Sequence, residues 1–140
     1  MTKFTTSRYI PASPQALFGA FRDPELLAQW WGPKDFTNTF NVFVFKVGGK
    51  WSFVMHGPDG KSYPNESEFS ELFTDHKIVI SHISEPRFIL SITIEPSEEG
   101  SLVTWVQAFQ NDQVAKNIAH IVEPSNEQNL DRLTIVVRHS

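Results

Sequence analysis

Apolar positions recur with a helical spacing near the start of the chain and with a period of two over its middle. Residues 4–10 alternate loosely and predict an opening strand. Two short helices follow, because Ser13 and Asp23 are cap residues that each stand directly before a proline. Proline suits the first helical position, where no N–H is needed. Gly-Pro at residues 32–33 then ends the second helix.

The second helix carries the most informative apolar stripe of the chain. Its members share one side of the helix, at i, i+1, i+4 and i+5: Leu26, Leu27, Trp30 and Trp31. Two adjacent indoles at the end of such a stripe predict a large aromatic surface that packs against a concave part of the protein. The function then depends on what this concave surface encloses.

From residue 36 onward the period changes to two, which predicts antiparallel strands. Trp51, Phe53 and Met55 alternate with the side chains between them, and Phe69 lies in a strand that alternates with acids. Gly-Gly and Pro-Asp-Gly sequences mark turns between strands. The predicted strands cover six segments: residues 37–45, 51–56, 66–74, 77–84, 87–95 and 101–110.

The end of the chain returns to a helical period. Asp112 can cap a helix over residues 113–122, and Pro124 interrupts or bends that helix. Residues 125–128 have the form of a capping box for a last helix. The β-branched run at 134–137 would also suit a strand, but the cap and the apolar period together favour a helix.

The predicted order is therefore one strand, two short helices, six antiparallel strands and a terminal helix. A long antiparallel sheet curls because its strands twist. One helix can cover the concave side of such a sheet without filling it. We therefore expect an α+β fold, a single domain over residues 1–140, and a cavity between sheet and helix.

Composition narrows the range of possible functions. Twelve Phe and four Trp are many rings for 140 residues, and they can fill a core or line a hollow one. The net charge of −4 is scattered and Lys and Arg do not cluster, which argues against a nucleic-acid partner. Without cysteine, disulfides and thiolate metal sites are excluded. The five histidines show no metal-ligand spacing, so neither metal nor cofactor is expected.

No apolar segment has the length of a signal peptide or of a membrane span. We therefore expect a cytoplasmic protein with no membrane partner.

Several short elements, in this order, resemble the activator-of-heat-shock-protein-ATPase-like (AHSA-type) family. That family belongs to the START-like, pollen-allergen-like helix-grip superfamily, also called SRPBCC. The resemblance runs over nearly the whole chain and implies a helix-grip fold of the order β-α-α-β6-α, in which a curved antiparallel sheet wraps around a C-terminal helix and encloses a deep apolar pocket. The matching elements are residues 23–25, 30–33, 48–51, 55, 57–60, 63–65 and 130–133.

The chain departs from the bacterial members of this family at two places. Those members usually carry acid-x-acid-x-Arg just before the Gly-Gly pair, where this chain has Val42, Val44 and Lys46. They also tend to have a Gly-Trp pair early in the final helix, where this chain has Ser125 and Asn126. Both replacements fall at expected pocket or rim positions, so a relative's ligand does not transfer directly.

Ring-rich strands beneath one covering helix favour non-catalytic binding of a small hydrophobic or aromatic ligand. The alternative for each ring is packing in the core, and for His120 a structural or surface role. No catalytic residue or metal ligand is predicted. The predicted ligand-binding residues are Trp30, Trp31, Trp51, Phe53, Met55, Phe69, Trp105 and His120.

Two other function classes stay open. A pocket enzyme, cyclase-like or hydrolase-like, would need acid–base groups, for which Tyr63, Arg87 and His120 are the candidates. Nucleophilic catalysis is less favoured, because there is no cysteine and no Gly-x-Ser-x-Gly sequence. The resemblance also leaves room for an interaction module that activates a chaperone ATPase, and a homodimer is left open.

Overall fold

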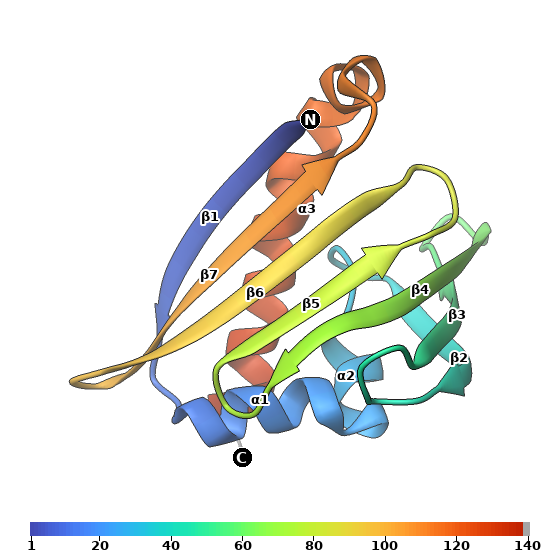
Figure 1. Cartoon of the computed structure of the whole chain (residues 1–140). Coiled ribbons are helices and arrows are strands. Elements are labelled where there is room, and N and C mark those ends of the chain that lie inside the picture. The colour runs from blue at the N-terminus through green and yellow to red at the C-terminus, as the bar shows by residue number, and fades with distance from the viewer. Residues whose placement is uncertain (139–140) are drawn as a thin grey trace.

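In the computed structural model, which describes residues 1–138, seven strands form one antiparallel sheet (Figure 1). The strand order is β1-β7-β6-β5-β4-β3-β2, so β1 and β2 form the two edges. This order of elements confirms the predicted α+β helix-grip fold. The elements are β1 (Thr2–Ile10), α1 (Pro14–Arg22), α2 (Pro24–Trp30), β2 (Thr37–Phe43), β3 (Lys50–His56), β4 (Ser62–Phe73), β5 (Lys77–His82), β6 (Phe88–Ser97), β7 (Gly100–Phe109) and α3 (Asp112–Arg138).

Both short helices begin at the predicted caps. The Ser13 hydroxyl accepts a hydrogen bond from the amide of Ala16 at 3.1 Å, and the Asp23 carboxylate accepts one from the amide of Glu25 at 3.0 Å. Gly32, which follows α2, has a φ of 99°, a conformation that glycine adopts without strain. Local sequence signals therefore fix the start of both helices and the end of α2.

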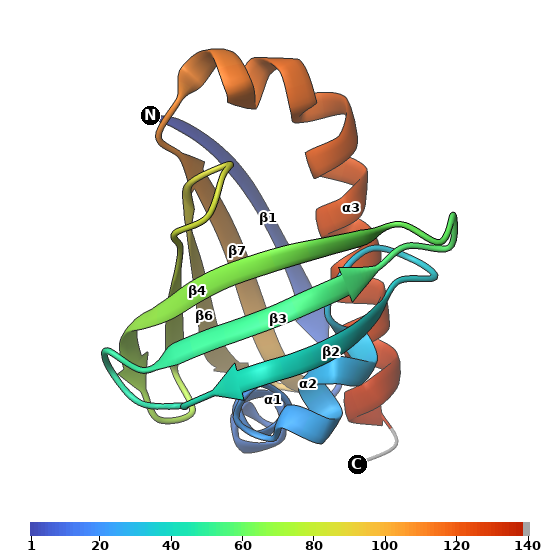
Figure 2. The ribbon, with the colours of Figure 1, turned by 90° about the vertical axis from the view of Figure 1, so that its right-hand side faces the viewer.

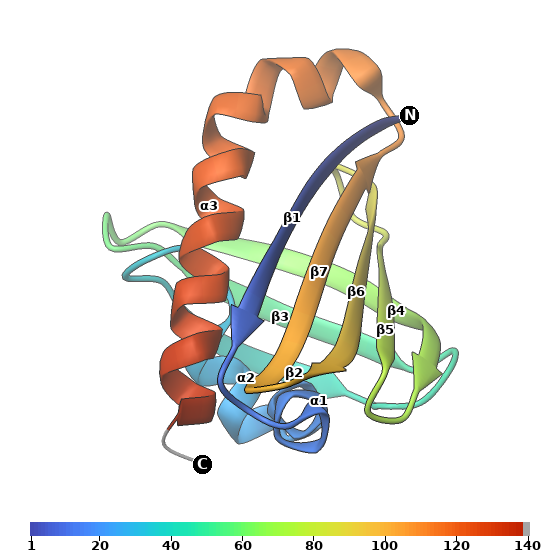
Figure 3. The ribbon, with the colours of Figure 1, turned by 90° about the vertical axis from the view of Figure 1, so that its left-hand side faces the viewer.

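At Pro124, where the sequence predicts an interruption or a bend, the C-terminal helix bends (Figures 2 and 3). α3 runs through Pro124 without interruption, so residues 125–128 continue the helix and do not cap a new one. The proline is exposed, and the helix bends: its first turns cross beyond the end of the sheet and its later turns run along the open side (Figures 2 and 3). The true cap is Asn111, whose side chain accepts from the amide of Val114 at 3.0 Å, while Asp112 accepts from the hydroxyl of Thr2.

A β-bulge alters the inward face of β4. The pairing of β4 with β5 shifts register between Phe69 and Glu71. Phe69 is buried, but beyond the bulge Leu72 takes the inward place and Phe73 is 53% exposed. An uninterrupted period of two would place Phe69 and Phe73 on one face, but the extra residue of the bulge reverses the period.

The four tryptophans meet around Trp31. Its ring centroid lies 5.6 Å from that of Trp30, 4.9 Å from that of Trp51 and 5.9 Å from that of Trp105. These rings, with the apolar side of α1, fill the part of the concave sheet face that adjoins α1 and α2. Within residues 1–138, no helix has both the length and the apolar character needed to cross a membrane.

Candidate ligand-binding pocket

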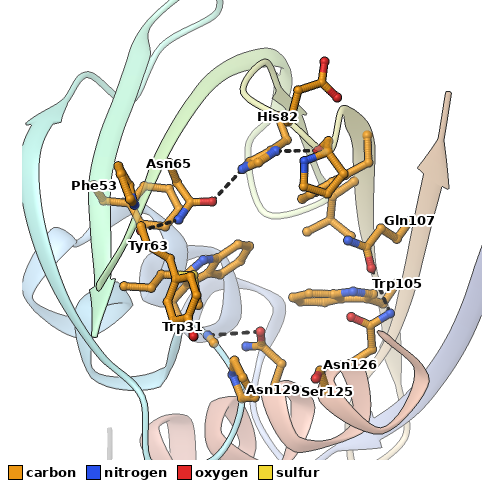
Figure 4. Close-up of a pocket in the computed structure, with 18 of the residues that line it drawn as sticks. Trp31, Phe53, Tyr63, Asn65, His82, Trp105, Gln107, Ser125, Asn126 and Asn129 are labelled. Atoms are coloured by element: carbon orange, nitrogen blue, oxygen red, sulfur yellow. Dashed lines mark hydrogen bonds between the residues drawn. The ribbon is translucent and has the colours of Figure 1, made fainter. Parts of the chain in front are cut away.

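A cavity of about 420 Å³ lies beyond the tryptophan cluster, between the concave face of the sheet and α3 (Figure 4). The volume falls within the range of small-molecule sites, roughly 300–1,000 Å³. Its apolar wall includes Trp31, Phe53, Met55, Phe88, Leu90 and Trp105. Its polar wall includes Asn65, His82, Gln107, Ser125, Asn126 and Asn129.

Half of the predicted ligand-binding residues border this cavity. Trp31, Phe53, Met55 and Trp105 lie on its wall. Strand alternation points Phe53, Met55 and Trp105 inward, whereas Trp31 comes from the end of α2. Their contact with a ligand stays a prediction.

Three other predicted rings lie in the packed core and do not border the cavity. Trp30 is fully buried beside α1, and its indole N–H donates to the carbonyl of Ala20 at 3.0 Å. Trp51 and Phe69 stack in parallel planes with centroids 5.9 Å apart. Their rings therefore take the structural alternative, since neighbouring aromatic side chains already cover them.

His120 does not lie in the pocket. It is exposed on the first part of α3, before the bend at Pro124. Among the described histidines, His82 at the end of β5 borders the cavity. A sequence signal for it exists, because His82 follows Ile78 and Ile80 at the period of two that places all three on the buried face.

Polar contacts fix the His82 ring, which is only 7% exposed. Nδ1 lies 2.9 Å from the carbonyl oxygen of Pro86, and Nε2 lies 2.6 Å from the side-chain oxygen of Asn65. The ring also stacks on Phe88, with centroids 4.4 Å apart and planes 8° apart. Burial lowers the pKa of His82, while the carbonyl of Pro86 and the carboxylate of Glu85 oppose that shift.

The loop that carries Trp31 is held by polar side chains of α3. The Asn129 side-chain oxygen accepts from the amide of Gly32 at 3.1 Å, and its nitrogen donates to the carbonyl of Trp30 at 3.3 Å. Lys34 donates its amide to the side chain of Gln128 at 3.1 Å. These bonds satisfy backbone groups beyond the end of α2, which no helical partner can reach.

Arg132 completes this clamp one turn further along α3. Its guanidinium donates to five carbonyl groups on both sides of the glycine, those of Gln29, Trp31, Gly32, Pro33 and Phe36. Burial lowers the pKa of Arg132 and Asp35 raises it, and the guanidinium stays charged at neutral pH. Sequence reasoning missed this role, because the carbonyls belong to residues about a hundred positions away.

The opposite wall of the cavity carries neutral donors and acceptors. Trp105 is 2% exposed, and its indole N–H has no partner in the described part of the chain. Gln107 accepts from the side-chain nitrogen of Asn126 at 3.1 Å. Among residues 1–138, no group of three His, Asp or Glu side chains could hold a metal ion.

A comparison with known protein families identifies one matching family model. The family model described as "Activator of Hsp90 ATPase homolog 1-like protein" matches residues 11–138. No curated protein matches the chain.

Solved structures match over almost the full length. A protein from Nitrosomonas europaea has a TM-score of 0.90 at 18% identity, covering 98% of this chain and 94% of its own. One from Arthrobacter aurescens has a TM-score of 0.90 at 21% identity, with 99% and 87% covered. An AHSA1-like protein from Aeromonas hydrophila has a TM-score of 0.77 at 18% identity, with 99% and 93% covered. At such identities the likeness shows a shared fold.

Proposed function

The chain belongs to the family of activator of Hsp90 ATPase homolog 1-like proteins, and we propose that this member binds a small hydrophobic or aromatic molecule without converting it. The family and fold are those of ligand-binding or activator modules in general. The cavity of about 420 Å³ between the sheet and α3 is the observation that carries the proposal. In this proposal the protein works in the cytoplasm, with a small molecule as its partner.

The wall of the cavity supports a ring-bearing ligand. Trp31 and Trp105 have ring centroids 5.9 Å apart and planes tilted by 36°, and both border the cavity. Phe53 and Leu90 add buried apolar surface, so a flat apolar molecule would leave water for a largely aromatic environment. Such a transfer is favourable in proportion to the apolar area buried.

The polar contacts favour binding over acid–base chemistry. Both ring nitrogens of His82 already have partners in the protein. Arg87, one of the predicted acid–base candidates, lies 3.5 Å from Glu85, whose side chain is 83% exposed. Tyr63, another of those candidates, borders the cavity and is 43% exposed. A general acid or base would need a free proton-transfer atom facing the ligand, which His82 lacks in this state.

The alternative is a module that activates a chaperone ATPase, as the family description suggests. Such a module would act through its outer surface and would not need the cavity. A variant that fills the cavity therefore separates the two functions.

A cavity-filling variant tests the proposal directly. Ser125 borders the cavity from α3, and its hydroxyl makes no hydrogen bond within residues 1–138, so Ser125→Trp fills space without breaking a contact. Lys116→Trp, on an exposed face of the same helix, is the matched control. The probe is N-phenyl-1-naphthylamine, an uncharged dye whose emission rises in apolar surroundings.

We expect saturable dye binding at one site per chain, weakened at least tenfold by Ser125→Trp and unchanged by Lys116→Trp. Circular dichroism verifies that both variants fold. If the folded protein binds neither the dye nor a panel of uncharged aromatic and aliphatic molecules, or if Ser125→Trp binds as well as the parent, the proposal is wrong.

A further inference from the structure

Gln107 places an amide among apolar side chains on the inward face of β7. Trp105 and Phe109 lie two residues away on either side of it, share its face and are buried. On the neighbouring strands, Gln107 is paired with Phe4 of β1 and Leu90 of β6. An amide in such surroundings loses much of its hydration, so its polar atoms need other partners.

The protein supplies only part of the partners that this amide needs. The side-chain oxygen of Gln107 accepts from the side-chain nitrogen of Asn126 in α3 at 3.1 Å. Within residues 1–138, the side-chain nitrogen of Gln107 and the side-chain oxygen of Asn126 have no hydrogen-bond partner. If both amide groups are turned over, the bond between them reverses its direction and again leaves one donor and one acceptor. The pair therefore offers a free donor and a free acceptor in either orientation.

A molecule in the cavity can reach both free atoms. Gln107 and Asn126 are half-buried and border the cavity. In the described part of the chain, the unpaired side-chain atoms that are closed to water are the oxygen of Asn38 and the indole nitrogens of Trp51 and Trp105. The nitrogen of Gln107 and the oxygen of Asn126 are not among these closed atoms, and Figure 4 shows both on the cavity side of the amide pair.

The other amides of the cavity wall are already engaged. The oxygen of Asn65 lies 2.6 Å from Nε2 of His82, and its nitrogen donates to the carbonyl of Tyr63 at 2.8 Å. Asn129 uses both its oxygen and its nitrogen to hold the loop after α2. On this wall, the free amide capacity therefore belongs to the pair from β7 and α3.

No buried charge accompanies the amide pair. Among the described residues that border the cavity there is no lysine, arginine or aspartate, and the side chain of Glu85 is 83% exposed. A carboxylate or phosphate moved from water to this wall would lose its hydration without gaining a counter-charge. The wall therefore favours a ligand that is polar at one place but carries no charge.

We infer that the cavity takes an uncharged aromatic molecule bearing an amide-type group, which both donates to and accepts from the side-chain amides of Gln107 and Asn126. This inference rests on the proposed binding function and narrows its ligand class. The rings of Trp31 and Trp105 supply the apolar contact, and the amide pair selects for a ligand that has a donor as well as an acceptor.

Four probes that share one ring system test the inference: naphthalene, methyl 2-naphthyl ketone, 2-naphthamide and 2-naphthoate, each competing with N-phenyl-1-naphthylamine at pH 8. We expect 2-naphthamide to bind about tenfold more tightly than naphthalene, which corresponds to about 1.4 kcal/mol. The ketone has an acceptor but no donor, so its affinity should lie between these two. The naphthoate, which is ionised at this pH, should bind more weakly than 2-naphthamide.

Variants then assign the selectivity to the amide pair. The double variant Gln107→Met, Asn126→Leu replaces both partners of one hydrogen bond, so neither is left buried without the other. The quantity compared is the ratio of 2-naphthamide to naphthalene affinity within each variant, because a change in cavity size affects both probes alike. We expect this ratio to fall to about twofold or less in the double variant, and to about threefold in Gln107→Met alone.

Gln110→Met is the matched control. Gln110 is exposed just beyond the end of β7 and does not border the cavity, so the same chemical change there should leave the ratio at the parent value. Circular dichroism verifies that each variant folds, and Gln107→Met alone decides the test if the double variant does not fold.

The outcomes separate the two claims. If naphthalene binds but 2-naphthamide gains nothing over it or over the ketone, if 2-naphthoate binds most tightly, or if the ratio survives loss of the amide pair, the inference is overturned and the binding function stands. An equal fall of the ratio in Gln110→Met would overturn it too. If no probe binds or displaces the dye, the binding function and the inference fall together.

Discussion

Replacing Arg132 with alanine should destabilise the protein more than any change at an exposed arginine. The guanidinium is half-buried between α3 and the loop after α2. Nη1 lies 3.2, 3.1 and 2.9 Å from the carbonyl oxygens of Trp31, Gly32 and Pro33. Nη2 lies 2.8 and 3.0 Å from those of Gln29 and Phe36.

The magnitude follows from counting donors. The two Nη atoms carry four hydrogens for five carbonyls, so some bonds are shared. A hydrogen bond from a charged group contributes about 1.5–3 kcal/mol net when its partner is otherwise unpaired. Gln29, Lys34 and Asp35 are exposed, so water can rehydrate part of this loop after the change. We therefore expect a loss comparable to one or two such bonds, about 3 kcal/mol, or a drop in Tm of about 10 °C.

Urea unfolding followed by tryptophan emission measures this loss. Arg87→Ala is the matched control, because Arg87 is exposed and pairs only loosely with Glu85 at 3.5 Å, and it should cost less than about 0.5 kcal/mol. Arg132→Lys keeps the charge but not the planar fork, so it should recover less than half of the loss. If Arg132→Ala unfolds within about 0.5 kcal/mol of the parent at an unchanged m-value, water replaces the clamp fully and our reasoning is refuted.

Two further predictions use the same unfolding assay. Because burial lowers the pKa of His82, the unfolded chain takes up a proton before the folded one as the pH falls below about 6.5, so stability should drop from there until the folded ring also titrates. His82→Gln should lose that slope, and an NMR titration that places the pKa of His82 above 6.5 would contradict us. Gly49→Ala should cost several kcal/mol, because its Cβ would stand 2.0 Å from the backbone oxygen of Val44. Gly19→Ala in α1, with no atom within 4 Å, should be neutral or stabilising, and equal effects would refute the contact argument.

Most helices and strands could be predicted because their signals are local in the sequence. The caps at Ser13 and Asp23 act within three residues, and the period of two needs only neighbouring positions. The exceptions are the bulge after Phe69 and the continuous helix through Pro124, where tertiary packing decides. A bulge adds one residue to a strand, and no residue type in this segment signals it. A helix tolerates a bend at a proline when the bent helix still covers the sheet.

The polar wall of the site was harder to predict than its apolar wall. Alternation indicates which residues face inward, and so it places Trp105 correctly. It does not indicate whether an inward ring meets another ring or a cavity, which depends on contacts between distant strands and helices. His82 and Asn65 come together across two paired strands, and Asn126 reaches Gln107 from α3. Such partners share no local pattern.

The adjacent tryptophans at the end of α2 show how one apolar stripe can supply both a core residue and a pocket residue. Helical spacing puts Trp30 and Trp31 on the same side, and this predicts the same role for both. Trp31, however, is the C-cap, with φ −67° and ψ 133°, so its backbone is already extended and its side chain leaves the direction of the stripe. Both rings contact Trp105, but Trp30 packs beside α1 away from the cavity, whereas Trp31 borders the cavity. The end of the helix, and not its apolar period, therefore sets the boundary between the core and the pocket.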